Sequence, residues 1–101
     1  MSYHVYVLYS LSTDKFYRGY TNNLEDRIYR HNSGREISTK SGAPWSLIWT
    51  TEKESASKAM ILERKLKNLS RQRLLIFMNK YDTGLVNQEV FNKIQSHSSS
   101  S

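Results

Sequence analysis

The chain has 101 residues, enough for one domain, and its 38% hydrophobic and 24% charged residues place it among globular proteins. The sequence has no apolar run near the ~18 residues that a bilayer span requires, and no cysteine for a disulfide or thiolate metal site. The net charge of +6 indicates a polyanionic partner. Because the N-terminus enters a strand pattern without the basic region of a secretory signal, we expect a cytoplasmic protein with no membrane partner.

The first two predicted elements are strands. Alternation with many β-branched and aromatic residues predicts them over residues 3–10, "YHVYVLYS", and 15–21, "KFYRGYT". The connection between them is short, which favours an antiparallel hairpin.

A short helix is predicted next, with its punctuation in place. Asn22 can cap its start, Glu25 stands in a capping-box relation to Asn22, and Gly34 supplies a left-handed stop. Residues 35–44 are polar and predict a loop, and a third strand follows over 45–52.

Two further helices are predicted in the second half of the chain. Apolar residues follow a helical period over 55–69, and Ser70 can cap a helix that runs to about Tyr81 and ends before Gly84. The residues expected to face inward in this second helix are Leu74, Phe77, Met78 and Tyr81.

The resulting fold class is α/β (α+β), a small three-stranded, mainly antiparallel sheet flanked by helices. One domain is expected over residues 1–83, followed by a C-terminal extension over 84–95 that contains a weak helix. The serine-rich residues 96–101 predict a disordered tail.

Positive charge is concentrated in one segment. Between Lys53 and Lys80 there are eight cations and two carboxylates, which accounts for the whole excess of +6. The segment is either a solvated helix face or a surface for backbone phosphates. The residues that we expect to bind nucleic acid are Lys58, Arg64, Lys65, Lys67, Arg71 and Arg73.

Arg27 and His31 lie one turn apart on the first predicted helix. With Leu24 at zero on a helical wheel, Arg27 lies at about 300° and His31 at about 340°, beside the apolar stripe. Both side chains are expected to emerge where the helix meets the sheet, a good place for a cleft. The alternative is an arginine stem along the core rim and a histidine bonded to a backbone carbonyl.

Glu63 is unusual because it falls inside the apolar stripe of its predicted helix. Burying an unpaired carboxylate costs several kcal/mol unless a cation or donors compensate. Its partner is therefore either a base such as Arg27, in a structural ion pair, or a divalent metal of the magnesium type.

Tyrosines are frequent in the first two strands, at positions 3, 6, 9, 17 and 20. With a period of two, Tyr6 shares a face with Leu8, whereas Tyr3 and Tyr9 lie on the other face. Most of these rings are expected to pack across strands. A tyrosine can also act as a general base, but only with help from nearby cations or a metal.

Together these residues resemble the GIY-YIG nuclease superfamily, specifically its small single-domain bacterial branch, which is similar to the N-terminal nuclease domain of the bacterial excision-repair nuclease. "HVY", residues 4–6, occupies the place of the first motif, and "YRG", residues 17–19, that of the second. Arg27, His31 and Glu63 stand where the family has its arginine, its helix histidine and its metal-binding glutamate. The resemblance covers about residues 3–80.

The resemblance implies a role for each of these positions. Tyr6 would help to deprotonate the attacking water, and Tyr17 would line the site near the scissile phosphate. Arg27 would stabilise charge on phosphoryl oxygens, His31 would assist proton transfer, and Glu63 would anchor a single Mg²⁺ or Mn²⁺ ion.

Three positions depart from the family pattern. His4 replaces the first glycine, Arg18 replaces the usual aliphatic residue before Gly19, and Leu75 stands where many family nucleases have an asparagine. The last departure affects expected catalytic efficiency more than fold.

The function expected from these features is a metal-dependent endonuclease acting on DNA in repair or processing. Branched, nicked or single-stranded DNA is the expected partner, because nothing in the sequence resembles a base-reading module. The alternatives are a non-catalytic nucleic-acid-binding module with the same fold, and a protein-interaction or structural role.

Overall fold

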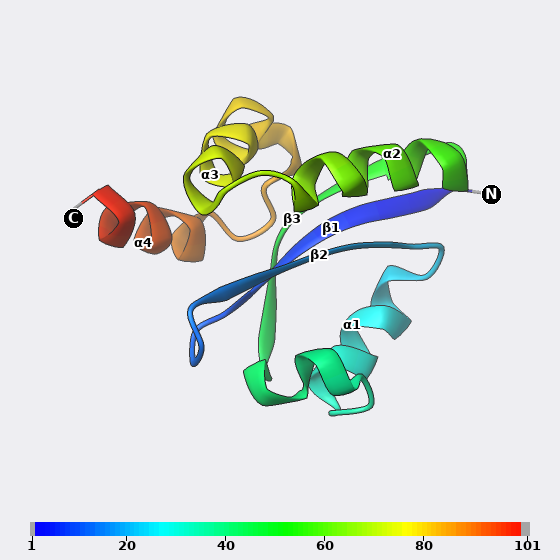
Figure 1. The fold of residues 1–101 in the computed structure, drawn as a ribbon, viewed down its shortest axis with the longest axis horizontal. Coiled ribbons are helices and arrows are strands. Elements are labelled where there is room, and N and C mark those ends of the chain that lie inside the picture. Colours follow the sequence, from blue (N-terminus) through cyan, green and yellow to red (C-terminus); the bar gives the residue numbers. More distant parts are fainter. Residues whose placement is uncertain (1, 100–101) are drawn as a thin grey trace.

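The computed structural model describes residues 2–99, and its centre is a three-stranded antiparallel sheet (Figure 1). The strands are β1 (Tyr3–Ser10), β2 (Lys15–Thr21) and β3 (Trp45–Lys53), in the order β2–β1–β3. The hairpin of β1 and β2 places Tyr6 opposite Gly19. The predicted fold class is therefore confirmed.

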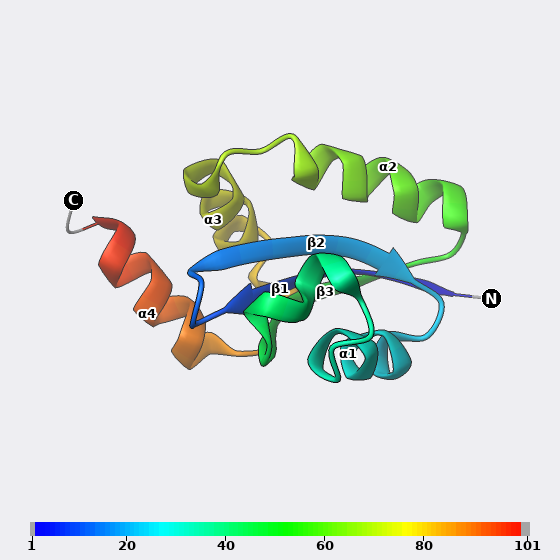
Figure 2. The ribbon, with the colours of Figure 1, turned by 60° about the horizontal axis from the view of Figure 1, so that its bottom comes forward.

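Helices cover both faces of this sheet (Figure 2). Helix α1 (Leu24–Asn32) lies on one face, and α2 (Ala56–Lys67) and α3 (Arg71–Lys80) lie on the other. Two short 3₁₀ helices, η1 (Ile37–Gly42) and η2 (Asp82–Gly84), connect these elements, and α4 (Gln88–Ser99) follows at the end.

The pleat of β1 divides the core into two clusters, as its alternation predicts. Val5, Val7 and Tyr9 are buried with residues of α2, α3 and α4, in the larger cluster. Tyr6 and Leu8 belong to the smaller cluster, against which Leu24 and Ile28 of α1 pack. Alternate side chains of β1 therefore pack against the two helical layers on opposite faces of the sheet.

The helix caps follow the sequence closely, with one shift. Ser55 and Ser70 cap α2 and α3 through their side chains, and Gly34 has the positive φ of +78° expected of a helix stop. The cap of α1 is Asn23 and not the predicted Asn22, because the Asn23 side chain accepts a hydrogen bond from the amide of Asp26.

The predicted loop over residues 35–44 differs from the structure, which places η1 there. The segment is fixed by the indole of Trp45, whose Nε1 donates to the carbonyl of Thr39 over 2.7 Å. Thr39 and Gly42 are buried within it. Packing against the large Trp45 ring, which the local sequence does not reveal, orders this segment.

The C-terminal part of the chain is more ordered than predicted. Helix α4 continues through Ser99, so residues 96–99 of the predicted tail are helical, and 100–101 lie outside the described residues. Phe91 and Ile94 anchor this helix in the larger core cluster. Tyr81, predicted to face inward, is 46% exposed, and Leu75 is buried instead.

The two edges of the sheet differ. Leu85 forms an isolated bridge with Trp49 on β3, and the amide of Val86 donates to the carbonyl of Ile48 over 2.9 Å. Strand β2 forms the other edge, beside the first turn of α1.

Within residues 2–99, no helix has the length and hydropathy to cross a membrane.

Candidate active site

A pocket of about 360 Å³ opens at the β2 edge of the sheet, between the two helical layers. Tyrosines of β1 and β2 form much of its wall, while Arg27 enters from α1 and Glu63 from α2. The lining residues are Tyr3, Tyr6, Tyr17, Gly19, Tyr20, Thr21, Asn22, Arg27 and Glu63. The pocket thus gathers four of the five predicted catalytic side chains.

Gly19 is required by the position of the Tyr6 ring. A Cβ atom at residue 19 would lie 2.6 Å from the Tyr6 hydroxyl and 3.2 Å from the Tyr17 ring. These distances are shorter than van der Waals contact, so any larger residue would displace Tyr6. The glycine of "YRG" therefore keeps both phenols at the pocket.

The turn from β2 into α1 positions Arg27. The Thr21 hydroxyl accepts a hydrogen bond from the amide of Asn23 over 3.0 Å, at the point where the strand ends. Asn23 then caps the helix, so Arg27 follows one turn later and lines the pocket.

Behind Tyr6 lies a chain of buried polar groups. The Tyr6 hydroxyl is 3.1 Å from Nε2 of His31, and Nδ1 of His31 is 2.7 Å from the Thr39 hydroxyl. Thr39 donates to the carbonyl of Glu36, so Nδ1–H of His31 donates to Thr39 and Nε2 accepts from Tyr6. His31 is only 1% exposed and lies beneath the pocket wall, not at its opening.

Burial controls the protonation of this pair. It raises the pKa of Tyr6 above the ordinary phenol value, an effect that Tyr17 reinforces and the charge of Arg27 opposes. Burial also lowers the pKa of His31 below 6.5, although the charge of Glu36 opposes the shift. At neutral pH the phenol is protonated and the imidazole is a neutral acceptor.

Glu63 reaches the pocket from the layer opposite Arg27. Its side chain is 14% exposed, and its Oε1 lies 3.5 Å from Nζ of Lys67, one helical turn away. The predicted alternatives were an ion pair with Arg27 or another base, and a metal. In the structure Glu63 forms an ion pair with the exposed Lys67, and its side chain also lines the pocket.

This donor set fits one kind of metal site. Among residues 2–99, no three His, Cys, Asp or Glu side chains form a metal-binding group, so a cage built by the chain alone is absent there. Magnesium commonly takes one or two carboxylates, with water and phosphate oxygens as its other ligands. Glu63 offers one hard oxygen ligand in a pocket with room for those others.

Comparison with known proteins identifies the family of the chain. The model of the GIY-YIG catalytic domain matches residues 2–82. The chain belongs to the GIY-YIG family. This is a nuclease family, so a nucleic acid is the substrate class that membership implies.

Small GIY-YIG proteins are the relatives found. A UPF0213 protein of Natronomonas pharaonis is 39% identical over 70 residues, which cover 68% of this chain and 81% of that protein. A UPF0213 protein of Staphylococcus haemolyticus is 36% identical over 76 residues, 74% of this chain and 93% of that protein.

A solved structure extends the similarity to three dimensions. The solution NMR structure of the UPF0213 protein BH0048 from Bacillus halodurans aligns with a TM-score of 0.52 and 31% identity. The match covers 78% of this chain and 84% of that one. The names of these relatives state no activity.

The cations expected to bind nucleic acid have different surroundings. Lys58 is paired with Glu54, Lys67 with Glu63, and Arg71 with Asp14, while Lys65 lies over the Phe77 ring. Arg64 and Arg73 are exposed on α2 and α3. Arg71 also donates to the Asp14 carbonyl over 3.1 Å, so it holds the β1–β2 turn in addition to any role with phosphate.

Several site residues of this GIY-YIG chain escaped the sequence analysis. Thr39 and Glu36 complete the hydrogen-bond chain behind Tyr6, and Asn22 lines the pocket. No motif marks Thr39, which becomes part of the site only because η1 packs against α1. Tyr3 and Tyr20 line the pocket as well, whereas the sequence predicted only that most of the five strand tyrosines pack across strands.

Proposed function

We propose that this chain is a metal-dependent endonuclease that hydrolyses DNA phosphodiester bonds. The observation that carries the proposal is the pocket itself, which brings Arg27 and Glu63 from opposite helical layers together with two phenols of the sheet. These are a guanidinium for phosphoryl oxygens, a hard ligand for a cation, and hydroxyls that exchange protons.

Tyr6 and His31 form the proton-transfer pair. A water in the pocket gives a proton to the Tyr6 oxygen as it attacks phosphorus, while Tyr6 passes its own proton to Nε2 of His31. The hydrogen bond of 3.1 Å between these atoms is already in place, and the neutral imidazole can accept. The imidazolium then keeps its Nδ1–H bond to Thr39. This relay avoids the free phenolate that burial disfavours.

Arg27 and Tyr17 position the phosphate, and Glu63 would hold the cation. The guanidinium of Arg27 offers several donors to the phosphoryl oxygens, where charge develops during attack. A Mg²⁺ or Mn²⁺ ion bound at Glu63 would supply a Lewis acid beside the leaving oxygen.

The substrate is selected by shape more than by base sequence. The exposed cations of α2 contact phosphates, which gives affinity that depends on salt and not on sequence. We therefore propose branched, nicked or single-stranded DNA as the substrate, and DNA repair or processing in the cytoplasm as the setting.

Cleavage of a panel of labelled DNAs, with Mg²⁺ or with EDTA, tests this function. Wild type should cut at least one structured substrate only with the metal. Arg27→Ala and Glu63→Gln should each lower the rate by at least about 100-fold. Arg30→Ala and Glu89→Gln are the controls, because they make the same changes of residue type outside the pocket and break only exposed helix pairs with Asp26 and Lys93.

If the Arg27 and Glu63 variants cleave DNA at the wild-type rate, the assignment of these two residues to the active site is wrong. The second candidate function, a non-catalytic nucleic-acid-binding module, is favoured by Leu75, which is buried in the core where many family nucleases have asparagine. It predicts salt-sensitive binding to DNA or RNA without cleavage under any metal.

A further inference from the structure

A second pocket, of about 270 Å³, lies across α2 from the first one. Trp49 of β3, Phe77 of α3 and Tyr81 contribute aromatic rings, and Lys53 and Lys65 contribute cations. We call these five residues the aromatic pocket. Nothing in the proposed cleavage chemistry uses them.

The rings of the aromatic pocket form a connected platform. Trp49 meets Phe77 edge to face at a centroid distance of 5.4 Å, and Phe77 lies 4.7 Å from Tyr81. Nε1 of Trp49 donates to the Tyr81 carbonyl over 2.9 Å. A Cβ at Gly84 would lie 2.6 Å from Nε1 of Trp49, so the glycine allows η2 to close on the indole.

This platform is accessible from one side. Trp49 is 2% exposed and serves as the floor, whereas Tyr81 is 46% exposed. A fixed aromatic floor with an exposed ring at its rim is suited to receive a flat apolar ligand by stacking.

The charge of the pocket selects an anionic ligand. Its lining contains two lysines and hydroxyls from Thr51 and Thr83, but no carboxylate, in contrast to the pocket that contains Glu63. Nζ of Lys65 lies 5.8 Å from the centre of the Phe77 ring, and Nζ of Lys80 lies 5.5 Å from that of Tyr81. Cations beside an accessible ring such as Tyr81 are the combination that binds a nucleobase with its phosphates.

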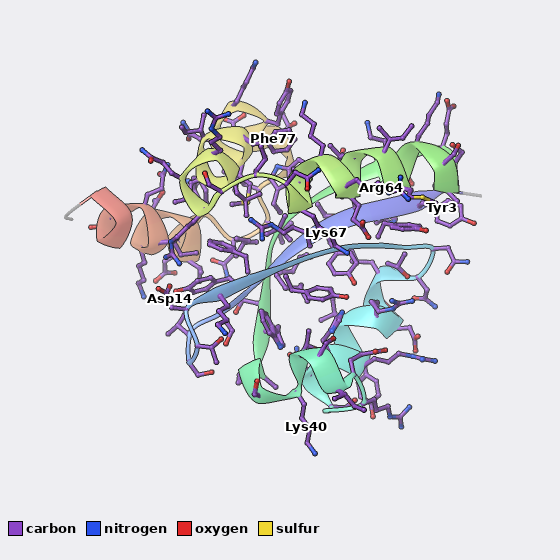
Figure 3. The ribbon with its side chains drawn as sticks, in the orientation of Figure 1. Tyr3, Asp14, Lys40, Arg64, Lys67 and Phe77 are labelled. Carbon is purple, nitrogen blue, oxygen red and sulfur yellow. The ribbon has the colours of Figure 1, made fainter. Side chains whose placement is uncertain are left out.

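A ridge of cations joins the two pockets around the solvent side of α2. With Glu63 at zero on the helical wheel, Lys67 lies at about 40°, Arg64 at about 100° and Lys65 at about 200°. All three are exposed, and Lys65 reaches the aromatic pocket. Figure 3 shows Lys67 on the β2 side of α2 and Phe77 on the other side, toward α3.

We propose that the aromatic pocket binds an unpaired base of the DNA strand whose phosphate occupies the first pocket. The strand crosses α2 along the cation ridge, and the base stacks on the exposed Tyr81 ring beside Phe77, while Lys53 and Lys65 contact its flanking phosphates. This inference rests on the proposed function, and it narrows the substrate to DNA with a single-stranded segment next to the cleavage point.

Binding in EDTA tests the inference without cleavage. Fluorescence anisotropy compares a blunt duplex with the same duplex carrying a single-stranded extension of several nucleotides, at one salt concentration. Wild type should bind the extended duplex about tenfold more tightly, the size expected for one stacked base. A 2-aminopurine placed in the extension should lose fluorescence on binding.

Tyr81→Leu should lower the affinity ratio of the two DNAs to near one and abolish the quenching. Tyr29→Leu is the matched control, because Tyr29 is also exposed and carries the Arg35 guanidinium 5.5 Å from its ring centre, but lies on α1 outside the aromatic pocket. Lys65→Gln, which leaves the rings in place, should lower the affinity for the extended duplex several-fold.

Three results would overturn the inference: equal binding of both DNAs by wild type, an unchanged ratio in Tyr81→Leu, or displacement of the extension by an equal concentration of free mononucleotide. Its failure is distinct from failure of the proposed function. Glu63→Gln should keep the affinity ratio and lose cleavage, whereas Tyr81→Leu should lose the ratio whether or not the chain cleaves DNA.

Discussion

At the scale of single residues, the candidate site depends on contacts that one glycine permits. Gly19 leaves space for the Tyr6 ring, which can then reach His31 behind it. His31 is held by Thr39 and shielded from solvent. The imidazole contacts two residues that line the pocket, through a hydrogen bond to Tyr6 and a ring contact with Tyr17, and in the proposed mechanism it would accept a proton from Tyr6 without touching the substrate.

Acidification should destabilise the chain through His31. Burial lowers the pKa of this residue in the folded state below 6.5, so the unfolded chain takes up the proton first as pH falls. The contribution of His31 to folding stability is therefore complete above about pH 6.5 and decreases as pH falls below that value.

Urea titrations of wild type and His31→Gln between pH 8 and pH 5 measure this effect. The free energy of unfolding of wild type should fall more steeply below pH 6.5 than that of the variant. Parallel curves would mean that His31 titrates alike in the folded and unfolded chain.

Residues of the candidate site could be predicted from the sequence where their type, spacing or motif indicates a chemical role. Arg27 and Glu63 were predicted in that way and Tyr6 and Tyr17 through the family resemblance, and the structure places all four at one pocket. Their catalytic roles stay predictions. Thr39 could not be predicted, because its importance arises from the packing of η1 against α1, which no local pattern encodes.

At the scale of elements, strand β2 uses its two faces differently. Tyr17 and Gly19 face the smaller cluster and the pocket of the candidate site, while Arg18 points to the layer of α2 and α3. Nη2 of Arg18 donates to the Leu69 carbonyl over 3.3 Å, which links β2 to the connection between α2 and α3. Nε of Arg18 is buried without a hydrogen-bond partner among residues 2–99.

Replacing Arg18 should cost little, because burial already disfavours its charge and lowers its pKa. Arg18→Leu should change the free energy of unfolding by less than about 1 kcal/mol in either direction, since one hydrogen bond is exchanged for relief of a desolvated cation. Thermal and urea unfolding measure the change. The control is Arg71→Leu, which removes an ion pair with Asp14 of the β1–β2 turn and a ring contact with Phe16 of β2. If Arg18→Leu lowers the free energy of unfolding by more than this, the hydrogen bond from Arg18 to Leu69 is needed for stability.

The bounds of helices and strands were predictable where the hydrophobic pattern and the capping residues agree. The alternation of 3–10 and 15–21 gave β1 and β2 at their observed ends, and Ser55 and Ser70 marked two helix starts. Prediction was weaker where tertiary packing decides. Tyr81 is the C-cap of α3, where the helical period used for the prediction ends, and α4 is anchored in the core by Phe91 and Ile94, upstream of the residues 96–99 that it includes.

At the scale of the whole molecule, the folding unit is larger than the region that the family model matches. That match ends at residue 82, yet Phe91 is fully buried and Ile94 is 2% exposed in the larger core cluster. The predicted division into a domain over 1–83 and an extension over 84–95 thus separates residues that share one core.

Truncation after residue 83 should therefore destabilise the chain strongly. Loss of a buried Phe typically costs about 3–5 kcal/mol, a large part of the ~5–15 kcal/mol that stabilises a small domain. Urea unfolding of the truncated chain should show a lower midpoint and a broader transition. A chain ending at Gln95 keeps Phe91 and Ile94 and serves as the control. Full stability after truncation at residue 83 would show that α4 packs without supporting the core.

The placement of β2 has a consequence for how such a site can change. Arg27 and Glu63 belong to different helical layers, and a single edge strand separates them. That strand acts as a spacer, because its thickness and twist fix how far the guanidinium stands from the carboxylate. Substitutions in either helix can tune one group while the other keeps its place, whereas a bulge or slipped register in β2 would disturb both together.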